Sequence, residues 1–280
     1  LPIPLADGDD PAAAIVASAD LDRAAVLRIV EATAEPSTEL RLRLVRAHLE
    51  AGDPGAAHEV LARLAVEEPG DWRQDWWRGI AALVAGDPAA ACARFDVVYS
   101  TLPGEIAPKL ALAAAAECAG SDDLAGPFYT RVALTDPQIA DAAFGRARAA
   151  LRAGDRDGAI AALDAIPETS ALHVAAQLAA VEAAMLVGAG EPELRACAAR
   201  VERLPLDPAT ANRVRTTLLD AAIALRPAGG PRFLGCEWRE PDLRAGLERC
   251  LRTWARLTTD RAERIALVDR ANAVRPRTLT

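Results

Sequence analysis

The chain has 280 residues, of which 51% are hydrophobic and only 4% aromatic, and its formal net charge is −8. Its 32 basic residues are scattered among 40 acidic ones, so there is no positive stripe of the kind that binds nucleic acid. The longest apolar run, residues 110–116, is far shorter than the roughly 20 residues of a membrane-spanning helix, so no membrane span is expected.

Residues 1–37 are expected to form a linker and helices that precede the main part of the fold. Asp10-Pro11 is typical of a helix start, and Asp20 is expected to cap a helix over residues 21–34. Pro36 ends that helix, because a residue before proline avoids the helical region. The N-terminus has no signal-peptide pattern and the five cysteines form no C-x-x-C pair, which favours a cytoplasmic location.

A recurring glycine dominates residues 38–225. The glycines follow one another at a constant interval, and each is expected to be a structural turn with left-handed backbone angles: Gly52, Gly86, Gly120, Gly154 and Gly188. Asp53 and Asp87, each followed by proline, are expected to cap the next helix. The interval, about 34 residues, is the spacing of the tetratricopeptide repeat (TPR). We predict an all-α fold, a right-handed α-solenoid of TPR-type helix-turn-helix repeats that start near residues 38, 72, 106, 140 and 174, plus a degenerate last helix.

Four repeats fit this frame well when positions are counted from each repeat start. Position 20 must be small and is alanine at 57, 91, 125 and 159, while position 27 is aliphatic at 64, 98, 132 and 166. The fifth repeat has Glu193 and Arg200 at these positions, so its second helix is degenerate. A shift of one residue there would place Ala196 or Ala198 inward instead.

The region after the repeats, residues 226–280, is expected to contain a loop and two capping helices. A helix from Asp207-Pro208 to about Leu225 precedes it, and residues 226–231 are expected to be the least ordered internal stretch. Helices over about 241–257 and 260–274 follow. Terminal helices commonly cover the exposed core of a solenoid.

No motif for catalysis, a cofactor or a metal ion is present in the sequence. The only lysine, Lys109, has no phosphate-binding loop around it, and the three histidines lie apart without an H-E-x-x-H pattern. His48 is expected to be a satisfied structural residue on an inward face. Cys92, Cys118 and Cys197 are expected at helix-interior positions, where small buried thiols are common. We therefore predict no enzymatic activity for this stretch of chain.

An apolar stripe is the candidate interaction site. Positions 2, 5, 9 and 12 of each first helix line the concave face of TPR proteins, and position 5 is apolar in every repeat: Leu42, Trp76, Leu110, Phe144 and Leu178. The stripe could receive an apolar peptide or helix, or tight curvature could bury it. Trp72, Trp76 and Trp77 leave the same two alternatives open, an interface anchor or core packing.

Several stretches between the glycines resemble one family more specifically than the repeat does. These are residues 102–114, 142–148, 154–159, 164–170 and 267–278, and residues 1–5 also match. Over most of its length the chain resembles the C-terminal tetratricopeptide domain of actinobacterial serine/threonine protein kinase G. Residues 1–5 resemble the segment that leaves the kinase domain.

The resemblance implies that this chain is a piece of a longer kinase, without the rubredoxin-like and kinase domains of the family. It implies a homodimer, contacts with the chain's own kinase domain and recruitment of protein partners. For the whole kinase it implies phosphorylation of a forkhead-associated regulator of glutamate and 2-oxoglutarate metabolism and, in mycobacteria, a link to survival in host cells. The alternative is a free-standing TPR adaptor that holds an apolar peptide or helix in its groove.

Overall fold

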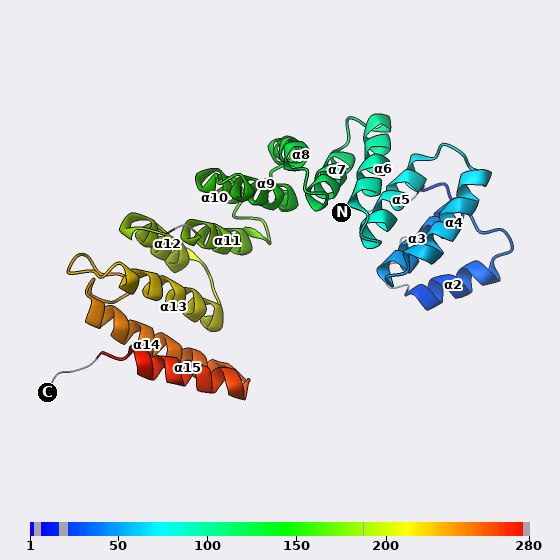
Figure 1. Ribbon diagram of the computed structural model, residues 1–280. Coiled ribbons are helices and arrows are strands. Elements are labelled where there is room, and N and C mark those ends of the chain that lie inside the picture. The colour runs from blue at the N-terminus through cyan, green and yellow to red at the C-terminus, as the bar shows by residue number, and fades with distance from the viewer. Residues whose placement is uncertain (3–6, 17–21, 187, 277–280) are drawn as a thin grey trace. The chain divides into compact units, whose positions relative to one another are not determined.

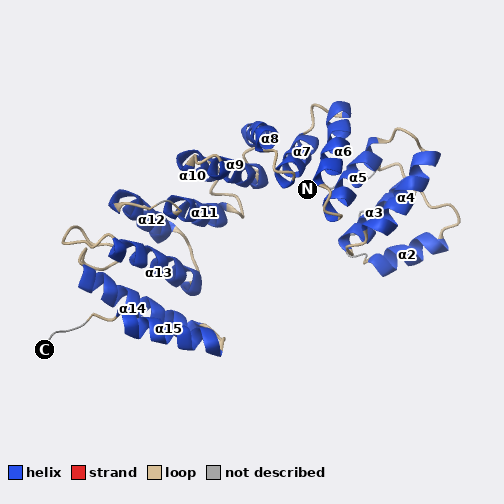
Figure 2. Ribbon diagram, in the orientation of Figure 1, coloured by secondary structure: helices blue, strands red, loops and turns tan. Residues whose placement is uncertain are grey.

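A computed structural model describes residues 1–2, 7–16, 22–186 and 188–276 of the chain. Over these ranges the fold is all-α, with 15 helices and a single isolated β-bridge between Phe233 and Cys236 (Figure 2). The chain forms two compact units, residues 1–149 and residues 150–280. The expected division along the sequence into residues 1–37, 38–225 and 226–280 stays a prediction.

The helices of the first unit are α1 (Ala13–Val16), α2 (Arg23–Ala32), α3 (Thr38–Glu50), α4 (Pro54–Glu67), α5 (Trp72–Val84), α6 (Pro88–Thr101), α7 (Ile106–Cys118), α8 (Asp122–Thr135) and most of α9 (Ala140–Arg152). The helices from α2 to α8 pack against their neighbours in chain order (Figure 1), and α1 packs against α3. The cap of α2 is Asp22, whose side chain accepts a hydrogen bond from the Ala25 amide. Asp20, the expected cap, lies outside the described residues.

The recurring glycines close the helix pairs by one backbone geometry. Gly52, Gly86, Gly120 and Gly154 have φ of +73°, +77°, +74° and +77°, and Gly188 has +44°. At each of the first four glycines the next amide donates to the carbonyl five residues before it, for example Asp53 to His48 at 2.9 Å. This bond satisfies a carbonyl that the helix end would otherwise leave without a partner. The glycine therefore reverses the chain without exposing or burying an unpaired group.

The cores of the first unit depend on small residues that face large ones. A Cβ atom added to Gly79 would lie 2.5 Å from the Phe95 ring, and one added to Gly145 would lie 2.4 Å from the Tyr129 ring. The Phe95 ring also meets Trp76 edge-on, with 5.4 Å between ring centroids. Such close packing leaves no room for an extra methyl group.

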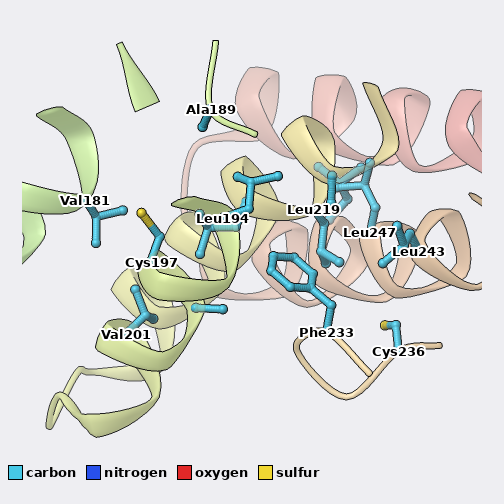
Figure 3. Close-up of a cluster of buried hydrophobic side chains, with 14 of the residues drawn as sticks. Val181, Ala189, Leu194, Cys197, Val201, Leu219, Phe233, Cys236, Leu243 and Leu247 are labelled. Carbon is cyan, nitrogen blue, oxygen red and sulfur yellow. The ribbon is translucent and has the colours of Figure 1, made fainter. Parts of the chain in front are cut away.

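The second unit contains α10 (Arg156–Asp164), α11 (His173–Met185), α12 (Glu191–Arg203), α13 (Pro208–Ala224), α14 (Glu240–Leu257) and α15 (Arg261–Val274). One hydrophobic cluster joins α11 to α15 and the loop before α14. In Figure 3 the Phe233 ring points from that loop towards the helices that carry Leu219 and Leu247. Helices α14 and α15 therefore complete a core to which α11, α12, α13 and the loop before α14 also contribute.

Arg195 of α12 holds the C-terminal part of the loop between α13 and α14. Arg195 donates hydrogen bonds to the carbonyl oxygens of Pro231 and Arg232, at 3.1 and 3.2 Å, and its guanidinium lies 4.7 Å from the centroid of the Trp238 ring. Phe233 and Trp238 are buried and meet edge-on. The glycines and prolines that mark this loop in the sequence give no sign of such an aromatic anchor.

The second helix of the fifth repeat is shifted by one residue, as the degenerate pattern allowed. Leu194 and Val201 are buried where the frame has Glu193 and Arg200. Of the two alanines proposed to turn inward, Ala198 is buried and Ala196 is exposed. The shift follows from burial, since it moves two charged side chains out of the core.

Two expectations about single residues are wrong. His48 is buried but its Nδ1 atom has no hydrogen-bond partner among the described residues, so it is not a satisfied structural histidine. Cys118 is the last residue of α7 and is exposed, so it is not a buried thiol in a helix interior. Cys197 is buried and Cys92 half-buried.

Candidate interaction surface

Three of the five residues of the apolar stripe belong to the core. Leu42, Trp76 and Leu110 are only 4%, 2% and 6% exposed. Leu42 and Trp76 lie in one hydrophobic cluster and Leu110 lies in the next. Of the two alternatives for the stripe, these three residues follow burial, so they do not line an open groove. Phe144 and Leu178 are half-buried.

The tryptophans of α5 show the same preference for the interior. Trp76 and Trp77 are buried, and Trp72 is partly buried against the same cluster. They pack between α5 and its neighbours, so they stabilise the first unit. Their role as an interface anchor has no support from their burial.

A cavity of about 720 Å³ lies in the second unit, between the α10–α11 loop and the end of α12. Helix α10 has 9 residues where α8, the second helix of the repeat before it, has 14, and the loop that follows α10 lines the cavity. The principal lining residues are Asp164, Ile166, Pro167, Glu168, Ser170, His173, Gln177, Arg200, Arg203 and Leu204. No residue of the predicted stripe lies among them.

A polar network forms one wall of this cavity. Arg200 forms a two-pronged ion pair with Asp164, with 3.0 Å between Nη2 and Oδ2, and also donates to Gln177 Oε1. The amide of Gln177 donates to Asp164 Oδ1 at 3.1 Å. The hydrogen bond from Arg200 lowers the pKa of Asp164, and the same bond raises the pKa of Arg200. Both groups therefore stay charged over the whole neutral range.

The rest of the cavity wall combines apolar surface with exposed charge. The Nδ1 atom of His173 lies 3.1 Å from the carbonyl oxygen of Ile166 and ties α11 to the loop. Arg203 and Glu168 are exposed. This mixture suits recognition of a polypeptide, which presents both apolar and charged groups.

The sequence signals for this site are two departures from the repeat. Pro69, Pro103 and Pro137 follow one another at the 34-residue interval, but the next proline stands at 167 instead of 171. Arg200 replaces an aliphatic residue. In the sequence these are two separate irregularities. Only the structure shows that they lie on the same cavity.

Three buried or half-buried cysteines lie outside the lining of this cavity. Burial raises the pKa of the Cys92, Cys197 and Cys250 thiols, which keeps them protonated and weakly nucleophilic at neutral pH. Within the described ranges no three His, Cys, Asp or Glu side chains are placed to hold a metal ion. No helix in the described part of the chain is both long and apolar enough to span a bilayer.

Helix pairs closed by a left-handed glycine at a constant repeat interval define a tetratricopeptide-repeat protein. Solved structures share this fold at low sequence identity. Yeast Tom70 matches with a TM-score of 0.54 and 12% identity over 90% of this chain and 49% of that one. The C-terminal part of a TPR protein from Cytophaga hutchinsonii matches with a TM-score of 0.53 and 12% identity over 85% of this chain and 96% of that one.

The chain belongs to the Protein kinase G tetratricopeptide repeat family, whose sequence profile matches residues 1–278. It is 38% identical to the serine/threonine-protein kinase PknG of Mycobacterium leprae and 36% identical to that of Mycolicibacterium smegmatis, over 99% of its own length in both cases. It spans 38% and 39% of the lengths of these two relatives.

Proposed function

We propose that this chain is the regulatory, dimerisation and protein-interaction part of a protein kinase G-like serine/threonine kinase, and that it does no chemistry itself. The observation that carries the proposal is the match of residues 1–278 to the tetratricopeptide region of this family. TPR domains present a scaffold of helices to other proteins. For the whole kinase, the same reasoning proposes a forkhead-associated regulator as substrate and control of glutamate and 2-oxoglutarate metabolism.

The cavity of the second unit is the proposed contact for the partner, either the kinase domain or a recruited protein. Its bidentate Asp164–Arg200 pair orders one wall, while Arg203 is exposed and Pro167 and Leu204 are half-buried at its rim. A preorganised wall with an accessible charged rim favours a specific protein contact. The apolar-peptide adaptor is the weaker alternative, because Leu42, Trp76 and Leu110 are in the core.

The test is binding of the chain to the kinase part of a protein kinase G relative, measured by isothermal titration calorimetry. Arg203→Glu reverses a charge at the rim of the cavity, and we expect it to weaken binding by about tenfold. Arg264→Glu makes the same change on the exposed face of α15 and serves as the matched control. If Arg203→Glu binds the kinase part with unchanged affinity, the contact does not lie at this cavity. A wild-type chain that binds no kinase part would contradict the proposed function.

A further inference from the structure

The N-terminal segment, residues 7–12, is bound to the start of α3 through defined hydrogen bonds. Asp10 Oδ1 accepts from the Ser37 hydroxyl at 2.6 Å and from the Ala12 amide at 2.7 Å, and its Oδ2 accepts from the Glu39 amide at 3.3 Å. The Asp7 amide donates to Glu39 Oε1 at 2.9 Å. The segment thus contacts the start of a helix that is distant in the chain, since Ser37 follows Asp10 by 27 residues.

The surface that receives this segment is built by the first two repeats. Glu39 is only 5% exposed and forms an ion pair with Arg73. Arg73 is held in place by Asp71, with 2.7 Å between Nη2 and Oδ2. Glu39 and Arg73 are 34 residues apart, so they occupy position 2 of successive repeats, one of the positions expected to line the ligand face. The receiving groups are therefore part of the repeat scaffold, while the bound segment comes from outside it.

A segment of another molecule could make the same contacts with this surface. A buried carboxylate takes a main-chain N–H, which any residue except proline can offer. The first turn of α3 and the Ser37 hydroxyl take a carboxylate, which the positive end of a helix favours. A segment with these two groups three residues apart satisfies the surface, whichever molecule supplies it.

We propose that residues 7–12, in which the Asp10 amide donates to the Asp7 carbonyl at 3.1 Å and closes a turn, are an intramolecular ligand that covers a binding site for an acidic turn of a partner protein. The partner segment presents a main-chain N–H to Glu39 and, three residues later, a carboxylate to Ser37 and the Glu39 amide. Because the internal segment is tethered close to the site, its effective concentration is high and an external segment binds only when the internal one is released. The site is separate from the cavity of the second unit, and its failure would leave the proposed function intact.

The test uses a fluorescent peptide with the sequence of residues 7–14 and the full chain in three forms: wild type, Asp10→Ala and Asp9→Ala. Asp9 is the matched control, because its side chain is exposed while Asp10 contacts α3. We expect the peptide to bind the Asp10→Ala chain at least about tenfold more tightly than the other two, measured by fluorescence anisotropy. A peptide that itself carries Asp10→Ala should not bind any of them.

Two results would overturn the proposal. One is absence of peptide binding to a folded Asp10→Ala chain, which would make the contact a structural attachment only. The other is equal binding to all three chains, which would place the peptide elsewhere. Circular dichroism checks that each chain is helical, and Asp10→Asn, which keeps the side-chain shape, replaces Asp10→Ala if that chain does not fold.

Discussion

Arg200 of α12 and Asp164 at the end of α10 form a bidentate ion pair in the wall of one cavity, although they are 36 residues apart in the chain. Both residues stand where the repeat becomes irregular: α10 stops early at Asp164, and Arg200 occupies a position that is aliphatic in the earlier repeats. The pair also anchors the side chain of Gln177, which is buried in α11. Three helices of the second unit are therefore joined by one charged group.

Replacing Arg200 with alanine should destabilise the second unit by roughly 1–2 kcal/mol. The substitution leaves the buried Gln177 carbonyl oxygen without its Arg200 donor and leaves Asp164 with the Gln177 amide alone. The loss is limited because Asp164 is partly exposed to water. Urea denaturation followed by circular dichroism measures the change. Arg264→Ala, on the exposed face of α15, is the control and should stay within about 0.5 kcal/mol of wild type. Equal effects of the two substitutions would show that the pair adds nothing to stability.

Stability should fall as the pH drops below about 6.5, the ordinary pKa of a histidine. Burial lowers the pKa of His48, and nearby Arg23 lowers it further, against the opposing charges of Asp53 and Glu59. The folded chain therefore binds a proton on His48 less readily than the unfolded chain, so acid favours unfolding. At a pH well above the ordinary histidine pKa, His48 is neutral in both the folded and the unfolded chain, so it no longer makes stability depend on pH.

The measurement for His48 is the unfolding midpoint in urea at pH 7.5 and at pH 5.5. His48→Gln should lose part of the difference between the two pH values, because glutamine does not titrate. His58→Gln, at an exposed position of α4, should keep the wild-type difference. The same pH dependence in both variants would assign it to other groups.

Adding one methyl group at Gly79 should destabilise the first unit by about 1–3 kcal/mol. The Cβ atom of Gly79→Ala would lie 2.5 Å from the Phe95 ring, which is itself packed against Trp76 and cannot move freely. Gly55→Ala is the matched control, because it lies in the first turn of α4 and its new atom would meet only Asp53 Oδ1, at an ordinary 3.7 Å. That variant should be at least as stable as wild type, since alanine favours the helix over glycine. Thermal unfolding measures both, and a stabilised Gly79→Ala would contradict the packing argument.

The proposed dimer predicts a mass of twice 29.4 kDa for the purified chain in solution. Multi-angle light scattering across a concentration series measures it, because a weak dimer dissociates on dilution by mass action. A constant mass of 29.4 kDa up to high micromolar concentration would remove dimerisation from the function proposed for this stretch of chain.

The all-α repeat fold was predictable from the sequence because its determinants are local. Glycine takes a left-handed φ at a helix end without a steric penalty, and the Asp after Gly52 and after Gly86 caps the next helix through the amide three residues on. Small core residues, such as the alanines at 57, 91, 125 and 159, recur with the same period. Helix bounds and the order of the helices follow from these short-range rules.

Exposure and long-range pairing were decided only by the tertiary structure. The sequence places Leu42, Trp76 and Leu110 on one face of their helices, but whether that face is open depends on how closely neighbouring helices approach, and they bury it. Asp164 meets Arg200, and Asp10 meets Ser37, because a shortened helix and a returning segment bring them together. No periodicity encodes such contacts, since each depends on a departure from the repeat.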